Sequence, residues 1–526
     1  MITSFIAGKE IKNSEPTGDA TSTMEIDGGS ITGFVAEGVA TYRGIPYAAP
    51  PVGRNRWREP QAVEPWDGVR HCDEFSAVCP QPRMGKAHAI FAETFENQSE
   101  DCLYLNVWSG AEAGETHRPV MVWVHGGALY RGAADNPGFD GAALAKKGVV
   151  VVSMNYRLGV LGFLAHPELT KESPNDSSGN YGLLDQIEAL RWVNRNIAQF
   201  GGDPDNVTVF GESAGGWCVS LLVATPMTDG LIHKAIGQSG GAFDPMPRLR
   251  EDANHLVSSE RAGEELIGVV IGEDRTQTLE HLRELDPKEL MIPFIMGHAG
   301  RSARPCANVD GYVFNEDVYT LFRKGRVKNI PTIVGSNRDE GTGLSGPFAP
   351  SSLQGLKDMY APLLGEHIFD EWCEVYNVKE DSDAQRAYLE GQRDLFFTWH
   401  MRTWARYASE LDPNVYQYFF THVPPIAESE TYGAFHCAEI TYAFNVVDKM
   451  DWATGTDVDL ADTMSSYWVN FADTGIPNGR GLPEWKRFDT ESEFCLEMCE
   501  TPEHISKLLK AECDVCEKYF DGLGTT

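Results

Sequence analysis

Two segments of the chain have the pattern Gly-x-Ser-x-Gly, which can hold a serine hydroxyl clear of the backbone as a nucleophile. They are residues 211–215 around Ser213 and residues 237–241 around Ser239. Glycines on both sides of the serine allow the strained turn from a strand into a helix that such a nucleophile needs. Because 52 of the 526 residues are Gly, a chance match is not rare, and the flanking sequence must distinguish the two.

The residues around Ser213 fit a nucleophile better than those around Ser239. Ser213 follows the apolar run 207–210 and precedes small and apolar residues, 214–223, that predict a helix. The free N–H groups and the dipole at a helix start stabilise negative charge that develops nearby. The glycines after Ser239 instead lead into a loop, so we interpret Ser239 as a buried structural serine and Ser213 as the nucleophile.

Acyl transfer also needs backbone donors for the oxyanion, a base, and a carboxylate that orients the base. Residues 125–128 (HGGA) follow an apolar strand and suit the donor role, since glycines leave the N–H groups unobstructed. The usual chain order is serine, acid, histidine. Both Asp339 and Glu340 are placed for the acid, and both His422 and His436 for the base, so the order alone leaves these two choices open.

The strands and helices expected around these residues indicate an α/β protein. Apolar, β-branched runs at 120–124 and 149–154 are typical of buried parallel strands, and 183–200 has the periodicity of a helix that ends at Gly201. Shorter strands are expected at 207–210, 234–237, 331–335 and 415–420. This alternation predicts a doubly wound, mostly parallel sheet with antiparallel strands before it. We expect a loose tail over 1–23 and a single domain over 24–526, with helical insertions near 242–325 and 345–412 that cap the site.

Composition limits the partners and the location of the protein. A formal net charge of −33 repels nucleic acid and anionic membrane surfaces. No apolar run reaches the ~20 residues that span a bilayer, and the first residues do not resemble a secretory signal. We therefore expect a soluble protein without membrane insertion, either cytoplasmic or secreted with its signal removed. The sequence gives no prediction of oligomeric state.

The eleven cysteines do not suggest a disulfide scaffold, because their number is odd and the chain is long. The last four have a spacing that is only loosely zinc-like: Cys495, Cys499, Cys513 and Cys516. Packing of the first two in a strand and of the last two on a terminal helix is the preferred interpretation. We expect no metal and no cofactor.

Several longer segments resemble one family. They are YRGIPYA (42–48), PPVG (50–53), SEDCLYLNVW (99–108), NYR (155–157), GGDP (201–204) and FGESAGG (210–216). From about residue 24 to about residue 490 the chain resembles type-B carboxylesterases/lipases, which include bacterial para-nitrobenzyl esterases, animal carboxylesterases and cholinesterases. The resemblance implies an α/β-hydrolase fold and hydrolysis of small-molecule carboxylic esters.

The resemblance also resolves the open choices. It implies the triad Ser213, Glu340 and His436, the oxyanion donors Gly127, Ala128 and Ala214, and a disulfide between Cys79 and Cys102. The alternatives to a carboxylesterase are a lipase or a specialised ester, amide or carbamate hydrolase that uses the same triad. A non-catalytic cholinesterase-like binding protein is disfavoured, since all three triad residues are present.

The chain departs from the family pattern at three places. Ala128 replaces a frequent third glycine, which disfavours the bulkiest alcohol groups, and Trp217 stands where smaller or polar residues are common. No tryptophan lies between Cys79 and Cys102, where cholinesterases hold choline by cation–π contact, so choline esters are disfavoured. Aromatic candidates for the substrate pocket, for each of which core packing is equally consistent, are Tyr130, Trp217, Phe397, Trp399 and Phe435.

Overall fold

The computed structural model describes most of the chain, and its first residues form short strands. The described residues are 2–6, 9–11, 18–82, 93–112, 114–253, 255–271, 278–291 and 306–523. Strand β1 (Ile2–Ile6) pairs antiparallel with β2 (Lys9–Ile11) and β9 (Glu93–Phe95) in a separate small sheet. The segment expected to be a loose tail therefore contains paired strands. Its run ITSFI is rich in residue types that favour strands, a local preference that the polar composition of the segment obscures.

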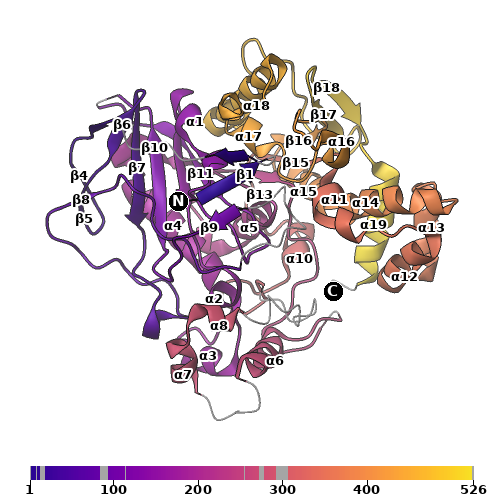
Figure 1. The fold of residues 1–526 in the computed structure, drawn as a ribbon, viewed down its shortest axis with the longest axis horizontal. Helices are drawn as coiled ribbons and strands as arrows, with labels where there is room; N and C mark the ends of the chain where they lie inside the picture. Colours follow the sequence, from indigo (N-terminus) through magenta and orange to yellow (C-terminus); the bar gives the residue numbers. More distant parts are fainter. Residues whose placement is uncertain are drawn as a thin grey trace.

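Among the described residues, twelve strands form the central sheet, which is parallel in its middle and antiparallel at both edges (Figure 1). The parallel part runs from β12 to β17, and β10 and β18 add antiparallel strands on its two sides. In spatial order the strands are β18 (Glu503–Ser506), β17 (Phe494–Met498), β16 (Val415–Phe420), β15 (Thr332–Asn337), β14 (Lys234–Gln238), β13 (Gly202–Glu212), β11 (Arg118–Val124), β12 (Val150–Met154), β10 (Tyr104–Ser109), β7 (Val39–Pro46), β6 (Phe34–Ala36) and β3 (Asp19–Ala20).

Helices cover both faces of this sheet, which explains why its central strands are apolar throughout. In β11, Val120, Val122 and Val124 pack in the core that includes α4 (Tyr181–Asn196) and α5 (Ala214–Ala224). Met121 and Trp123, which alternate with them, pack in a second core with α1 (Ala142–Lys146), α17 (Ile440–Ala443) and α18 (Gly455–Thr474). Strands buried on two faces have no polar side, so the doubly wound interpretation of the sequence is confirmed.

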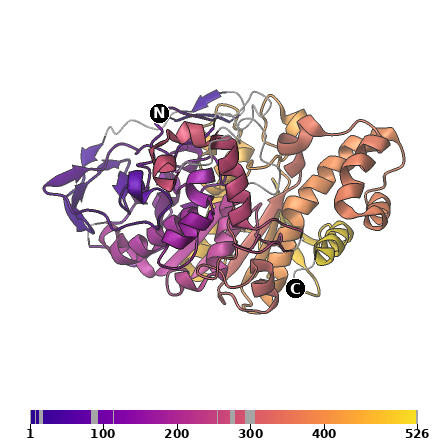
Figure 2. The same ribbon diagram turned by 90° about the horizontal axis from the view of Figure 1, so that it is seen from below.

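Both stretches expected to be helical insertions contain helices. The first holds α6 (Ser259–Ile271), α7 (Leu279–Glu284), α8 (Pro287–Leu290) and α10 (Val318–Arg323), although its residues 272–277 and 292–305 lie outside the described part. The second holds α12 (Leu353–Leu364), α13 (Glu366–Val375), α14 (Ala384–Arg393) and α15 (Trp399–Ser409), and α12–α14 project from one side of the sheet (Figures 1 and 2). Among the described residues, no helix combines the length and the apolar character needed to cross a membrane.

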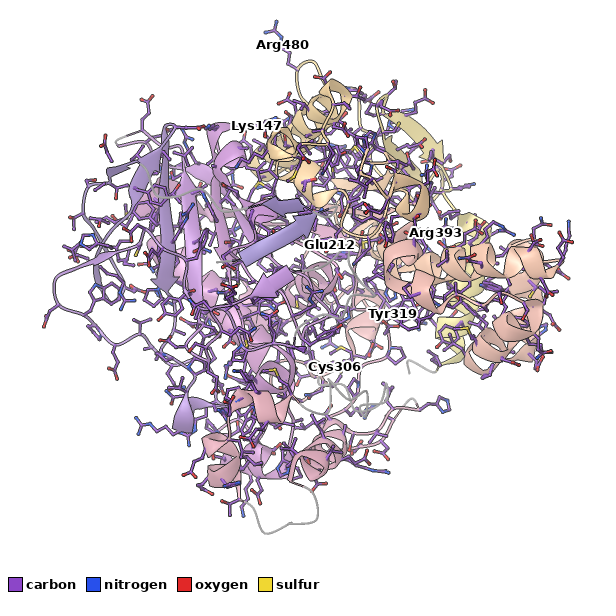
Figure 3. All side chains as sticks on the ribbon, viewed as in Figure 1. Lys147, Glu212, Cys306, Tyr319, Arg393 and Arg480 are labelled. Atoms are coloured by element: carbon purple, nitrogen blue, oxygen red, sulfur yellow. The ribbon has the colours of Figure 1, made fainter. Side chains whose placement is uncertain are left out.

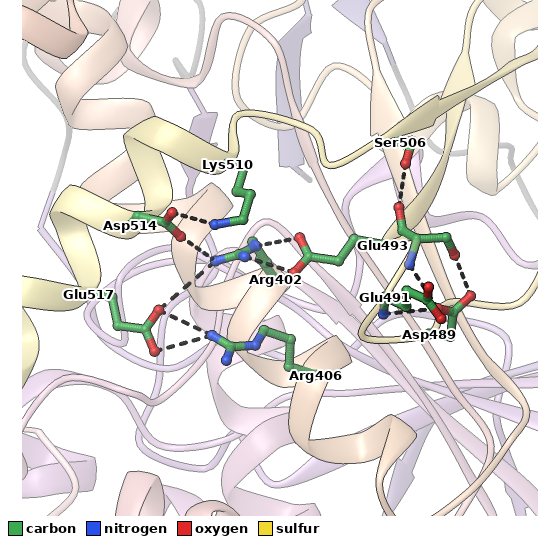
Figure 4. Close-up of polar contacts among 10 residues, drawn as sticks. Arg402, Arg406, Asp489, Glu491, Glu493, Ser506, Lys510, Asp514 and Glu517 are labelled. Carbon is green, nitrogen blue, oxygen red and sulfur yellow. Dashed lines mark hydrogen bonds and ion pairs between the residues drawn. The ribbon is translucent and has the colours of Figure 1, made fainter.

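The last helix, α19 (Lys510–Gly522), is held to α15 by a network of ion pairs (Figure 4). Arg402 of α15 is 4% exposed and donates two hydrogen bonds of 2.8 Å to the carboxylate of Glu493. Its guanidinium also lies 3.4 Å from Asp514, while Arg406 contacts Glu517 at 3.1 Å. Two arginines on one helix thus tie the C-terminal helix and the β17 end of the sheet to the second insertion.

Candidate active site

Ser213 lies at the sharp turn between β13 and α5. Its φ of 57° and ψ of −125° are strained for a residue with a side chain, and such strain persists only where the surroundings hold it. The packing there is tight. A Cβ on Gly126 would lie 3.0 Å from the Ser213 Cβ, and a Cβ on Gly215 would lie 2.0 Å from the Val124 carbonyl oxygen. Glycine at both positions lets the end of β11 approach the serine turn.

The second serine motif shares the backbone strain but not the access to solvent. Ser239 follows β14 with a φ of 50°, so the backbone conformation does not separate the two serines. Ser239 is 0% exposed, and its N–H donates to the Gly335 carbonyl at 2.8 Å. Ser213 is partly exposed and lines a cavity. Only the Ser213 hydroxyl is therefore positioned to meet a substrate.

Glu340, just after β15, contacts the imidazole of His436. The distance from His436 Nδ1 to Glu340 Oε2 is 2.5 Å, and both side chains are buried. The backbone N–H of Asn337 donates to Glu340 Oε1 at 2.8 Å, which fixes the carboxylate. His436 and Ser213 line the same cavity.

The other acid and the other histidine considered from the sequence have different contacts. Asp339 accepts a hydrogen bond of 2.7 Å from the Ala434 N–H and pairs with Arg338, so it holds the loop that carries His436. His422 Nε2 lies 2.7 Å from Asp457 Oδ1. The cavity lining includes neither Asp339 nor His422. The structure thus brings Glu340 to His436 and leaves the two alternatives in supporting contacts.

A second carboxylate, Glu212, is buried and lies near the centre of the molecule in the view of Figure 3. Its Oε1 is 3.2 Å from His436 Nε2. Burial raises the pKa of Glu212 to about 8, although the charge of His436 opposes this. Burial would lower the pKa of His436, but the carboxylates of Glu212 and Glu340 outweigh it and raise that pKa to about 9. The two groups therefore titrate as a coupled pair, and the charge on Glu212 governs how readily His436 releases its proton.

A third buried carboxylate, Glu439, lies behind this pair. Gln238 Nε2 donates to its Oε1 at 3.1 Å and Asn337 Nδ2 donates to its Oε2 at 2.6 Å. Trp468 Nε1 in turn donates to Gln238 Oε1 at 3.2 Å, which fixes the amide. Burial still raises the pKa of Glu439. Amide donors satisfy this carboxylate, while its proximity adds to the negative field around His436.

The loop after β11 borders the serine with a run of left-handed residues. Gly127, Ala128 and Leu129 have φ values of 103°, 55° and 65°. The start of the loop is anchored, because Tyr156 donates from its hydroxyl to the His125 carbonyl at 2.8 Å. Gly127 and Ala128 line the cavity with Ser213. Ser213 directly precedes α5, and the backbone N–H groups in the first turn of that helix have no acceptor within the helix.

The cavity at this site has a volume of about 190 Å³ and a mostly apolar lining. Of the aromatic residues considered from the sequence, Tyr130 and Phe435 line it. The Phe397 ring packs against the His436 ring with a centroid distance of 4.6 Å, although Phe397 is not part of the lining. Trp217 packs against the core, and Trp399 stacks on Phe520 in the interior, so neither lines this cavity.

Several lining residues were missed from the sequence. They are Phe139, Glu212, Leu344, Ile426, Cys437 and Trp452. Phe139 ends the short 3-10 helix Pro137–Phe139, and Trp452 lies in a turn more than three hundred residues later, so only the fold brings them together. Glu212 and Cys437 could have been noticed, since each is adjacent to a candidate catalytic residue.

The disulfide implied for Cys79 and Cys102 is absent, which corrects that expectation. Both side chains are buried free thiols. A hydrogen bond with Cys79, together with burial, raises the pKa of Cys102 well above its ordinary value. The Leu158 N–H also donates to Cys79 Sγ at 3.3 Å. Disulfide formation proceeds through a thiolate, and the raised pKa disfavours the thiolate of Cys102, so this cysteine is a poor reactant although the two are neighbours.

The C-terminal cysteines are dispersed over two elements. Cys495 is buried in β17 and Cys499 follows that strand, whereas Cys513 and Cys516 are buried on α19. Within the described ranges, the group of metal-ligating side chains that lie close enough to share an ion is a different one: Glu212, His436 and Cys437.

Comparisons with known proteins agree with this architecture. The model of the Carboxylesterase family matches residues 20–516. Fumonisin B1 esterase from Sphingopyxis macrogoltabida is 35% identical over 494 residues, which cover 91% of this chain and 86% of that protein. Para-nitrobenzyl esterase from Bacillus subtilis is 33% identical over 486 residues, which cover 89% and 93%. A solved PNB esterase structure superimposes with a TM-score of 0.80 at 31% identity and covers 94% of this chain and 99% of its own. The chain therefore belongs to the carboxylesterase family, has the α/β-hydrolase fold and is a serine hydrolase of carboxylic esters.

Proposed function

We propose that Ser213, His436 and Glu340 are the catalytic triad of this ester hydrolase. The observation that carries the proposal is the 2.5 Å contact between His436 Nδ1 and Glu340 Oε2, next to a strained serine on the same cavity. Glu340 fixes the ring so that Nε2 accepts the Ser213 proton as the hydroxyl oxygen attacks the ester carbonyl. His436 then protonates the leaving alcohol, and water repeats both steps on the acyl-enzyme to release the acid.

The N–H groups of Gly127, Ala128 and Ala214 serve as the oxyanion hole. The left-handed backbone at Gly127 and Ala128, and the position of Ala214 at the start of α5, support this assignment. Such donors act on charge that develops only in the tetrahedral state, and each is typically worth about 3 kcal/mol of barrier. The mechanism requires neither a metal nor a cofactor.

Small, uncharged esters with apolar groups are the proposed substrate class. The cavity has a volume of about 190 Å³. Phe139, Leu344, Ile426, Phe435 and Trp452 supply its apolar walls. The chain as a whole is strongly acidic, which disfavours anionic substrates. A volume of this size favours short acyl chains and gives no specific support to a lipase.

The test is hydrolysis of para-nitrophenyl esters from acetate to palmitate by the wild type and by Ser213→Ala, with Ser239→Ala as the matched control. Loss of a triad member is expected to lower kcat by about 10³–10⁶-fold, whereas Ser239→Ala should retain turnover in proportion to its folded fraction. Retention of activity in Ser213→Ala, or its loss only in Ser239→Ala, would refute the assignment. An optimum at long chains would contradict the substrate class alone.

A further inference from the structure

Cys437 is a thiol inside the cavity that the proposed ester chemistry does not use. It follows His436 directly in the chain, is partly exposed and contributes to the lining. Its side chain forms a hydrogen bond with the carboxylate of Glu212, the residue that precedes Ser213. A sulfur, an imidazole and a carboxylate therefore meet at one wall of the cavity.

These three side chains have the spacing of a metal site. Their ligand atoms lie within 4.8 Å of one another, and His436 Nε2 is already 3.2 Å from Glu212 Oε1. Two ligands of a tetrahedral Zn²⁺ ion, at bond lengths near 2.1 and 2.3 Å, are about 3.6 Å apart. The longest of these separations would have to contract by about 1.2 Å at most.

The surroundings of the cluster favour a cation in two further ways. Glu340 engages His436 Nδ1, and a carboxylate on the far nitrogen is the usual arrangement that orients a metal-binding histidine. Glu212 is 2% exposed, and its Oε1 lies 3.2 Å from His436 Nε2. Burial makes a negative charge on this carboxylate costly, and a cation bound beside it would recover part of that free energy.

We propose that Glu212, His436 and Cys437 bind Zn²⁺ or a similarly soft divalent cation, and that this binding reversibly inhibits ester hydrolysis. The Cys437 thiol, and His436 and Glu212 where they are protonated, release their protons to solvent as their bonds to the metal form. The cation occupies the Nε2 lone pair, so that His436 no longer accepts the Ser213 proton. The inhibitory part rests on the proposed triad, while the binding part rests on the three ligands alone.

Binding is tested first without catalysis, in the Ser213→Ala protein. Co²⁺ added to this protein should produce a thiolate-to-metal charge-transfer absorption in the near ultraviolet, which added Zn²⁺ removes. Adding Cys437→Ala to the same protein should abolish the band. Cys373→Ala, which removes a partly exposed cysteine on α13, is the matched control and should leave the band intact. No band, or a band that persists without Cys437, would overturn the site.

Inhibition is tested next with the wild type and the two cysteine variants, each normalised to its own rate in EDTA. Zn²⁺ should inhibit the wild type and Cys373→Ala, and EDTA should restore the rate. Cys437→Ala should need a Zn²⁺ concentration at least about 10–100-fold higher for the same inhibition. Removal of a partner that only orients a ligand already costs that much metal affinity, and Cys437 is itself a ligand. Mg²⁺, which takes oxygen ligands, should not inhibit.

The outcomes separate the two proposals. A Cys437-dependent cobalt band in a protein that hydrolyses no ester would leave the metal site standing and refute the proposed function. Equal inhibition of wild type and Cys437→Ala, or full turnover with Zn²⁺ bound, would overturn the inhibitory role. Because the cobalt spectrum is measured on a protein with all three ligands, poor folding of one variant does not prevent the test.

Discussion

Replacement of Glu212 by Gln removes a negative charge 3.2 Å from His436 Nε2 and should lower the pKa of that imidazole. A full charge at this distance stabilises the imidazolium by ~5 kcal/mol at an effective dielectric constant of about 20. That energy corresponds to about 4 pKa units at 1.36 kcal/mol per unit. Glu212 carries only part of this charge near neutral pH, because burial raises its own pKa to about 8. We therefore expect a decrease of about one to two units.

The assay is kcat/KM for a neutral para-nitrophenyl ester between pH 5 and pH 10.5, corrected for spontaneous hydrolysis, so that the range extends beyond the pKa of about 9 of His436. The base must be unprotonated, so activity is lost as pH falls through the pKa of His436 in the free enzyme. A lower pKa keeps His436 unprotonated to lower pH, and the acid limb of the Glu212→Gln profile should move to lower pH. The substrate has no ionisable group in this range, so the shift reports on the enzyme.

Glu439→Gln provides a graded comparison. Glu439 also raises the pKa of His436, but as the last of the named contributions, and its oxygens are already engaged by Gln238 and Asn337. The acid limb of the Glu439→Gln profile should therefore also move to lower pH, but by a smaller amount than that of Glu212→Gln. An acid limb that stays in place or moves to higher pH in Glu212→Gln, with the fold intact by thermal unfolding, would show that Glu212 does not control the base.

Three further predictions concern stability and the pocket. Arg402→Met leaves Glu493 buried without its two hydrogen bonds and should lower the free energy of unfolding by about 3–5 kcal/mol, measured by urea denaturation, with the exposed Arg386→Met as the control. Ala128→Gly removes the methyl from a residue that lines the cavity with a φ of 55°, and it should raise kcat/KM for tert-butyl esters relative to ethyl esters. An unchanged ratio would show that another wall excludes bulky alcohols. Trp452→Ala should move the acyl-chain optimum to longer para-nitrophenyl esters, because it enlarges the cavity; an unmoved optimum would place the acyl group elsewhere.

The sheet was predictable because its central strands are buried on two faces. Continuous apolar runs such as those of β11 and β12 have no other simple interpretation in a chain that alternates strands with helices. The expected strands at 120–124, 149–154, 234–237 and 415–420 lie within two residues of the observed bounds. The N-terminal strands were not predictable in the same way, since β1 is only five residues long and pairs with β9, about ninety residues later.

The candidate site was predictable only where chemistry depends on neighbours in the chain. Ser213 could be separated from Ser239 by the helix that follows it, whereas their similar backbone strain would not have done so. Glu340 and His436 are 96 residues apart, and nothing local to either reveals their contact. Their assignment came from the family resemblance. The same resemblance implied a disulfide between Cys79 and Cys102 that the structure lacks. A family pattern predicts that two cysteines are neighbours, but it does not determine whether they are oxidised.

The least predictable property of the site is its balance of charge. Three buried carboxylates, Glu212, Glu340 and Glu439, surround one imidazole. If all were ionised, even a protonated His436 would leave a net charge of −2 in a medium that penalises charge. The raised pKa values of Glu212 and Glu439 show that the fold relieves this surplus by favouring their protonated forms. Where these carboxylates are ionised, they stabilise a positive charge at Nε2, whether it is the imidazolium of the proposed reaction or the bound cation that would block it.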